Sequence, residues 1–190
     1  GFYKYSDQKE LIEAGFVWDF KINQEYNEFY IIKYNETLNI SEFYISRDGG
    51  YNFNLKNNGW WSPKNGRSAS TNDNHRGGKI AMTDDASVIY VALLGEEDDE
   101  IDDLSFAGLF KSYDKGESWI NLSPTNEIGG PYSEENPCMF CGSLNGWYFQ
   151  GWYDFDIEII DNNPNHLMVG GIRLRETTDG GLTWKEPNFR

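Results

Sequence analysis

Three aspartates, Asp48, Asp114 and Asp179, recur along the chain after 66 and then 65 residues, each inside the same short motif. The motif reads hydroxyl residue, any residue, Asp, any residue, Gly, any residue, small polar residue, aromatic residue. Carboxylates can bind metal ions or act as acids, but catalytic carboxylates do not normally repeat once per structural unit. An aspartate can also close a turn by accepting hydrogen bonds from backbone N–H groups. We therefore predict that these aspartates are structural.

The rest of the motif also fits a hairpin turn. Glycine adopts the positive φ that a tight turn needs without a Cβ penalty. The aromatic residue opens the next strand, and we expect it to fold back into the sheet as an apolar plug. The motif residues are Ser46, Asp48, Gly50 and Phe53, then Ser112, Asp114, Gly116 and Trp119, then Thr177, Asp179, Gly181 and Trp184.

An acidic run at residues 96–103 holds seven carboxylates in eight residues. Calcium takes six to eight oxygen ligands, so Asp98, Asp99, Asp102 and Asp103 are candidate calcium ligands. The run lacks the glycine-shaped loop of an EF-hand, and a solvated charge run is the alternative. We expect no other cofactor.

Cys138 and Cys141 are the only cysteines, in a C-x-x-C arrangement. With no second C-x-x-C to complete a zinc site and no βαβ pattern around it, the simplest interpretation is a local disulfide that stiffens a long loop.

The elements around the motifs are short runs of β-branched and aromatic residues. Three such runs precede each motif and one follows it, which predicts four strands per repeat, as in a propeller blade. The fold class is therefore all-β: about three four-stranded blades of a larger β-propeller, with the motif turns between third and fourth strands. The predicted units are blades at 1–57, 78–124 and 153–190, the last incomplete, joined by crossovers at 58–77 and 125–152. The best helical candidate is 6–14.

Three blades do not close a ring, because propellers typically have four to eight. We therefore expect the remaining blades of the same propeller as partners. Long connections at 56–78, 95–105 and 123–153 all emerge at the end of the sheets opposite the motif turns. They hold the candidate ligand-binding residues Trp60, Trp61, Arg76, Trp147, Tyr148, Trp152 and Tyr153. For Trp60 and Trp61 the alternatives are a sugar-stacking platform and packing against the blade.

The formal net charge is −15, with an isoelectric point near 4.4. Such a charge argues against nucleic acid and anionic membranes as partners. The sequence has no apolar run long enough for a transmembrane helix, so we expect no direct membrane insertion.

The repeated motif resembles the Asp-box, or BNR repeat, of sialidase-like β-propellers. Gly-Trp-Tyr-Asp at 151–154, Asn-Pro-Asn at 163–165 and Val-Gly-Gly at 169–171, followed by a motif copy, look like the secreted propellers exported by bacterial type IX secretion systems. Sortilin ectodomains and xyloglucanase-type glycoside hydrolases are similar more distantly. The resemblance implies a secreted or cell-surface protein that meets the secretion machinery and binds glycan or protein on the face opposite the Asp-boxes.

Catalysis is the alternative. Sialidases grip a substrate carboxylate with three arginines, and their arginine-isoleucine-proline motif is absent here. Another glycosidase needs two carboxyl groups close together, for which Asp154 and Asp156 are candidates. We expect a non-catalytic recognition or adhesion propeller; the alternative is a sialidase-like or xyloglucanase-like glycoside hydrolase whose remaining catalytic groups lie in blades outside this chain. An enzyme should show paired carboxylates with perturbed pKa values at the central channel.

Overall fold

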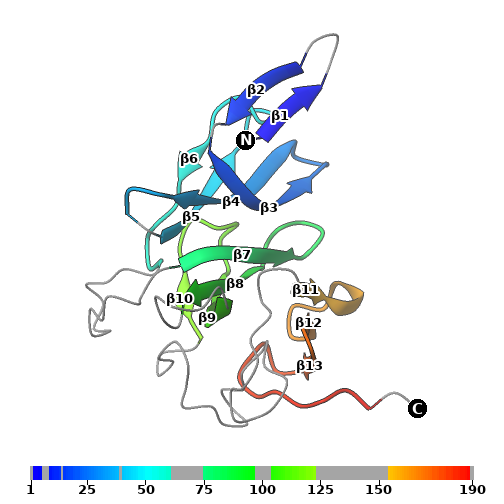
Figure 1. Ribbon diagram of the computed structural model, residues 1–190. Helices are drawn as coiled ribbons and strands as arrows, with labels where there is room; N and C mark the ends of the chain where they lie inside the picture. Colours follow the sequence, from blue (N-terminus) through cyan, green and yellow to red (C-terminus); the bar gives the residue numbers. More distant parts are fainter. Residues whose placement is uncertain are drawn as a thin grey trace.

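The computed structural model describes residues 2–5, 9–13, 15–38, 40–60, 75–96, 104–122 and 154–188. Three antiparallel sheets are stacked face to face, with a separate two-stranded hairpin before the first (Figure 1). In the described part of the chain the helical content is one 3-10 turn, Ile160–Asn162. The predicted all-β class is confirmed.

Each sheet is a meander in which strands adjacent in sequence are hydrogen-bonded neighbours. The first sheet contains β3 (Phe16–Asn23), β4 (Glu28–Asn35), β5 (Ile40–Ser46) and β6 (Asn54–Leu55). The second contains β7 (His75–Met82), β8 (Ile89–Glu96), β9 (Leu104–Ser112) and β10 (Ile120–Asn121). The third contains β11 (Asp156–Ile159), β12 (Leu167–Gly170) and β13 (Leu174–Thr177), and an isolated bridge between Glu176 and Lys185 stands where a fourth strand would begin.

The hairpin pairs β1 (Phe2–Tyr5) with β2 (Lys9–Glu13). The helical candidate at 6–14 is therefore wrong over Lys9–Glu13, and its other residues lie outside the described ranges. Two turns of helix are marginal in isolation, whereas pairing with β1 gives the backbone of β2 its hydrogen bonds. The second sheet also begins earlier than predicted, at His75 rather than at residue 78.

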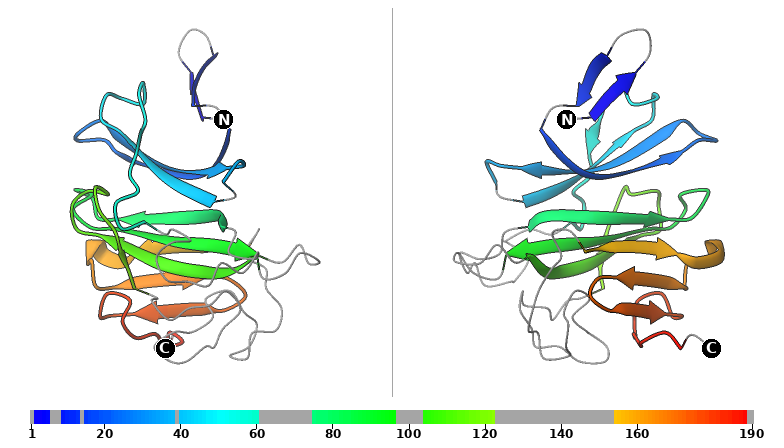
Figure 2. Two further views of the ribbon diagram at one scale, coloured as in Figure 1. Left: turned by 90° about the vertical axis from the view of Figure 1, so that its left-hand side faces the viewer. Right: turned by 45° about the vertical axis from the view of Figure 1, so that its right-hand side comes forward.

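Two apolar cores lie between the three stacked sheets (Figure 2). Strand β8 supplies both of them because successive side chains of a strand point to opposite faces. Ile89, Val91 and Leu93 pack toward the first sheet. Tyr90, Ala92 and Leu94 pack toward the third sheet. The second sheet is consequently buried on both faces.

The sequence predicts that the motif aromatic residues fold back into their own sheet. The two motif tryptophans instead pack between neighbouring sheets. Trp119 lies against the first sheet, with its ring centroid 4.6 Å from that of Phe43. Trp184 belongs to the core shared with the second sheet. Each therefore fills the space between its own sheet and the preceding one.

Candidate functional site

The three motif copies form turns of nearly identical geometry, here called the aspartate turns (46–53, 112–119 and 177–184). In the third turn, Asp179 Oδ1 accepts hydrogen bonds from the Thr177 hydroxyl at 2.7 Å and the Thr183 N–H at 2.9 Å. Asp179 Oδ2 accepts the Thr183 hydroxyl at 2.6 Å. The motif glycine, Gly181, has φ near +94°, so the turn requires the left-handed conformation that glycine tolerates.

These hydrogen bonds set the acidity of the aspartates. Bonds from the Asn52 side chain and backbone, and from Ser46, lower the pKa of Asp48 to about 2. For Asp179, burial raises the pKa, but hydrogen bonds from Thr183 and Thr177 outweigh burial and lower it to about 2. A general acid works best with a pKa near the operating pH, so these carboxylates suit an acceptor role in the turn.

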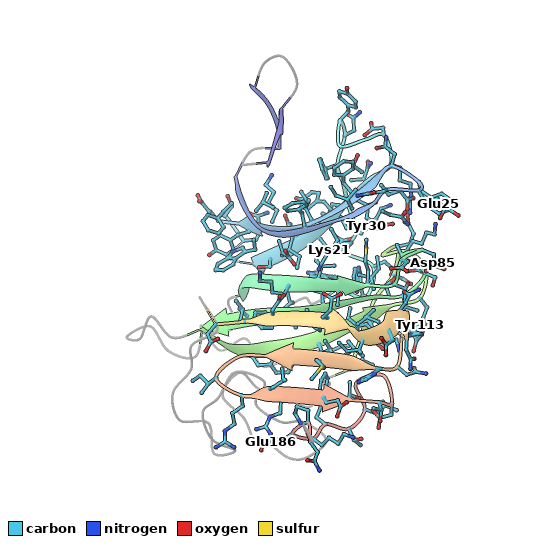
Figure 3. The ribbon with its side chains drawn as sticks, turned by 90° about the vertical axis from the view of Figure 1, so that its right-hand side faces the viewer. Lys21, Glu25, Tyr30, Asp85, Tyr113 and Glu186 are labelled. Atoms are coloured by element: carbon cyan, nitrogen blue, oxygen red, sulfur yellow. The ribbon has the colours of Figure 1, made fainter. Side chains whose placement is uncertain are left out.

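The aspartate turns share one end of the sheets with the β3–β4, β7–β8 and β11–β12 connections. The Gly49 N–H donates to the Asn27 carbonyl at 3.2 Å, and the Gly180 N–H donates to the Asn165 carbonyl at 2.9 Å. Figure 3 shows Glu25, Asp85 and Tyr113 at this turn end, and Glu186 toward the other end of the strands.

An ion-pair network at the turn end ties the first sheet to the second. Arg47 Nε donates to Glu28 Oε1 at 3.0 Å, and Arg47 Nη1 donates to Glu117 Oε1 at 2.5 Å. Lys56 Nζ also reaches Glu117, at 2.7 Å. Glu28 accepts the Tyr30 hydroxyl at 2.7 Å. The network holds the two blades in one relative position.

The innermost strands β3, β7 and β11 lie side by side, with β7 between the other two. Lys21 of β3 reaches Glu158 of β11, with 3.5 Å between Nζ and Oε2. Burial raises the pKa of Asp19, although the Ile80 N–H, which donates to Asp19 Oδ2 at 2.8 Å, and the charge of Lys79 oppose the rise. The Asp19 carboxyl group thus links the first two blades.

The two carboxyl groups considered for glycosidic chemistry lie at the start of the third sheet. Asp154 precedes β11, and Asp156 is its first residue. The exposed Asp156 side chain accepts the Ile157 N–H through Oδ1 at 3.0 Å.

A pocket of about 440 Å³ lies toward the end opposite the aspartate turns, lined by Arg173, Leu174, Glu186 and Pro187. Glu186 Oε1 accepts from Arg173 Nη1 at 2.7 Å and from Arg175 Nη1 at 3.1 Å. The hydrogen bond from Arg173 and the charges of Arg175 and Arg173 lower the pKa of Glu186. The pocket therefore combines the Arg173 guanidinium, the Glu186 carboxylate and an apolar wall, and Arg175 contacts the same carboxylate from outside the lining.

Arg175 is 4% exposed, and its Nε and Nη2 atoms are buried with no acceptor among the described residues. This cluster is not predicted from the sequence, where the arginines are compared only with those of a sialidase. The available signal was an Arg-x-Arg pair in a strand, at 173–175, followed by a carboxylate just after the aromatic residue of the turn.

Trp60 is the predicted ligand-binding residue whose side chain is described, and the sugar-platform interpretation is wrong for it. Its side chain is 3% exposed, its indole N–H donates to the Ser41 carbonyl at 2.8 Å, and its ring lies 5.1 Å from that of Phe110. Packing, the other interpretation, accounts for it. Arg76 lies on β7, and its side chain is outside the description.

The other predicted ligand, disulfide and calcium residues lie outside the described residues, so those interpretations stay predictions: Trp61, Trp147, Tyr148, Trp152, Tyr153, Cys138, Cys141, Asp98, Asp99, Asp102 and Asp103. The part of the chain that is described holds no group of three or more His, Cys, Asp or Glu side chains that could bind a metal ion. Within the same ranges, no helix is long and apolar enough to cross a membrane.

No protein-family model matches the sequence. No curated protein matches it either. Solved structures match in fold. The GH74 enzyme of Niastella koreensis aligns with a TM-score of 0.50 at 12% identity, over 90% of this chain and 22% of its own.

Two further structures align less well. The GH74 xyloglucanase from Xanthomonas campestris has a TM-score of 0.47 at 12% identity, over 89% of this chain and 21% of its own. YCF48 bound to a D1 peptide has a TM-score of 0.47 at 12% identity, over 90% of this chain and 38% of its own. The chain therefore spans well under half the length of these structures. At such identity the likeness to the Niastella protein concerns the fold alone: the three sheets are blades of a β-propeller.

Proposed function

We propose that this chain is part of a secreted or cell-surface recognition propeller of the Asp-box type, exported by a type IX secretion system, which binds glycan or protein at the end opposite the aspartate turns. The observation that carries the proposal is the contrast between the two ends. At the turn end the three turn aspartates accept hydrogen bonds from their own turns, and Arg47 pairs with Glu28 and Glu117. Toward the opposite end lies a pocket of about 440 Å³ lined by Arg173, Leu174, Glu186 and Pro187.

The sheets behind that pocket are packed against one another, which favours recognition because a preorganised site loses little entropy on binding. Two continuous cores join the three blades. The Arg47 network and the Asp19 hydrogen bond to Ile80 add polar links between the first two blades.

The first sheet also presents a face suited to another blade of the same propeller. Phe20 and Ile22 on β3 are 49% and 38% exposed. The strand registers place them at the positions that Ile80 and Met82 occupy in the second sheet, where the first sheet covers them. The remaining blades of the propeller are the partners that would bury this apolar face.

Recognition and hydrolysis can be separated with one set of glycans. The purified protein is applied to an immobilised glycan and peptide array, and the same glycans in solution are assayed for new reducing ends. We expect binding without release of reducing ends. Accumulating reducing ends would instead support a glycoside hydrolase.

Matched variants assign the binding end. Arg173→Ala alters the pocket, and Tyr51→Ser alters an exposed residue of the first aspartate turn. We expect Arg173→Ala to weaken array binding and Tyr51→Ser to leave it unchanged, and the reverse pattern would place the binding surface at the turn end. Export is checked by fractionation, where a protein confined to the cytoplasm would contradict that part of the proposal.

A further inference from the structure

Backbone hydrogen bonds hold both walls of the pocket beside β13. On one wall, the Gly171 N–H donates to the Arg173 carbonyl at 3.1 Å in the connection between β12 and β13. On the other wall, Glu176 and Lys185 exchange two backbone hydrogen bonds of 2.8 and 2.9 Å, and Glu186 is the next residue. The two walls are therefore set by the backbone before any ligand arrives.

The Glu186 carboxylate is anchored through one of its two oxygens. Arg173 Nη1 and Arg175 Nη1 both donate to Oε1, at 2.7 and 3.1 Å. Oε2 accepts no hydrogen bond from the part of the chain that the structure describes. The Glu186 side chain is 54% exposed and lines the pocket. The pocket thus holds an oriented carboxylate with one acceptor oxygen left for a ligand.

This acceptor selects among possible donors. Hydrogen bonds to an ionised acceptor are about twice as strong as those between neutral groups, so both hydroxyl groups and cationic groups could donate to Oε2. A cationic group at Oε2 would lie beside the two guanidinium groups that are bonded to Oε1, and like charges repel. A neutral hydroxyl group avoids this repulsion.

The apolar part of the lining narrows the ligand further. Leu174 and Pro187 present carbon atoms next to the carboxylate. A sugar ring carries hydroxyl groups at its edge and C–H bonds on its faces, so it can meet both kinds of surface at once. The volume of about 440 Å³ is within the usual range for small-molecule sites.

We propose that this pocket binds one neutral sugar residue of a glycan. A ring hydroxyl group donates to Glu186 Oε2, and a C–H face of the ring lies against Leu174 and Pro187. This inference rests on the proposed function, because it names glycan rather than protein as the ligand at the binding end.

The test is an NMR titration of the isotope-labelled protein with the neutral methyl glycosides of glucose, galactose, mannose and xylose. Tetrahydropyran, which has the same ring without hydroxyl groups, and the methyl glycoside of glucosamine, which is cationic, are the matched ligand controls. We expect at least one neutral glycoside to shift the backbone resonances of 173–174 and 186. Tetrahydropyran and the cationic glycoside should bind more weakly than that glycoside.

Substitutions at the carboxylate test the role of Glu186. Glu186→Ala should weaken binding of the glycoside at least about tenfold, because it removes the acceptor of a charge-assisted hydrogen bond. Glu186→Gln keeps an acceptor oxygen without the charge, so its loss should be smaller. Both variants should fold because the side chain is exposed. Glu25→Ala removes an exposed carboxylate at the turn end and should leave the affinity unchanged.

Four outcomes would overturn the inference: no neutral glycoside shifts the pocket resonances, tetrahydropyran binds as tightly as the glycosides, the cationic glycoside binds more tightly than the neutral ones, or Glu186→Ala keeps the wild-type affinity. The array binding proposed above separates the two claims. If the array ligand binds the wild-type protein and Glu186→Ala equally while no methyl glycoside binds, the sugar pocket is wrong and the recognition function stands. If a glycoside binds through Glu186 while nothing on the array binds, the sugar pocket stands and the recognition function is wrong.

Discussion

The two motif tryptophans offer a prediction in which the same substitution has different consequences. Trp119 and Trp184 occupy equivalent positions and are 5% and 8% exposed. Their indole N–H groups differ. Trp184 Nε1 donates to the Gly181 carbonyl at 3.2 Å. Trp119 Nε1 is buried, and no described residue accepts its hydrogen. Replacement by phenylalanine removes the indole N–H from both sites.

The expected difference follows from these hydrogen bonds. Trp184→Phe loses a hydrogen bond with a net contribution of about 1 kcal/mol. Trp119→Phe removes a buried unsatisfied donor, whose desolvation costs about 1–3 kcal/mol in the wild-type protein. The loss of ring atoms and the resulting cavity are similar at the two sites because both rings are nearly buried. Trp184→Phe should therefore lower the free energy of unfolding by about 2–4 kcal/mol more than Trp119→Phe does.

Urea denaturation followed by far-ultraviolet circular dichroism measures this difference without relying on tryptophan fluorescence. Equal m-values among the three proteins would show that the substitutions change stability rather than the unfolded state. If Trp119→Phe destabilises the protein as much as Trp184→Phe, the assignment of an unsatisfied donor to Trp119 is refuted.

Three further substitutions test the turns and the contacts between sheets. Gly116→Ala should lower the free energy of unfolding by at least about 2 kcal/mol, because φ is near +82° and the new Cβ would lie 2.9 Å from the Phe43 ring of the first sheet. The control Gly170→Ala, whose new Cβ would lie 3.7 Å from its nearest neighbour, should change thermal stability little. Equal losses of stability in the two variants would contradict this prediction. Arg47→Ala should lower the free energy of unfolding, measured by chemical denaturation, by about 1–2 kcal/mol, because it leaves the largely buried Glu28 carboxylate with weaker partners. The loss should be smaller at high salt. An unchanged free energy of unfolding at low salt would count against the network. The pKa of Asp179 is near 2 in the folded protein and near 3.9 in an unfolded chain, so its contribution to stability is present above about pH 4 and is lost as the pH falls toward 2. Between pH 4 and pH 2 the melting temperature of Asp179→Asn should therefore fall less steeply than that of the wild-type protein. Parallel curves of melting temperature against pH for the two proteins would contradict the low pKa of Asp179.

The strand order and the three turns are predictable from the sequence because the motif is local. A hydroxyl residue, an aspartate and a glycine within five positions bond to one another, as Thr177, Asp179 and Gly181 do. Strand runs on either side then follow from their short β-branched and aromatic composition. Nothing outside the segment is needed to form the turn.

Packing between sheets is less predictable, because it depends on residues far apart in sequence. The direction of Trp119 is set by Phe43 of the preceding sheet and by Trp60, whose own burial also depends on Phe110. The pocket likewise combines Arg173 with Glu186, which approach each other only when the segment after the third turn runs back along β13. A pattern of residue types does not contain that return path.

The central claim is that recognition takes place at the end opposite the aspartate turns. Hydrogen–deuterium exchange of the protein with and without its array-identified ligand tests this claim most directly. We predict slower exchange at 171–175 and 186–188 on ligand binding, and unchanged exchange in the three aspartate turns. Protection confined to the aspartate turns and the β3–β4 connection would contradict the account and place the binding surface at the other end of the propeller.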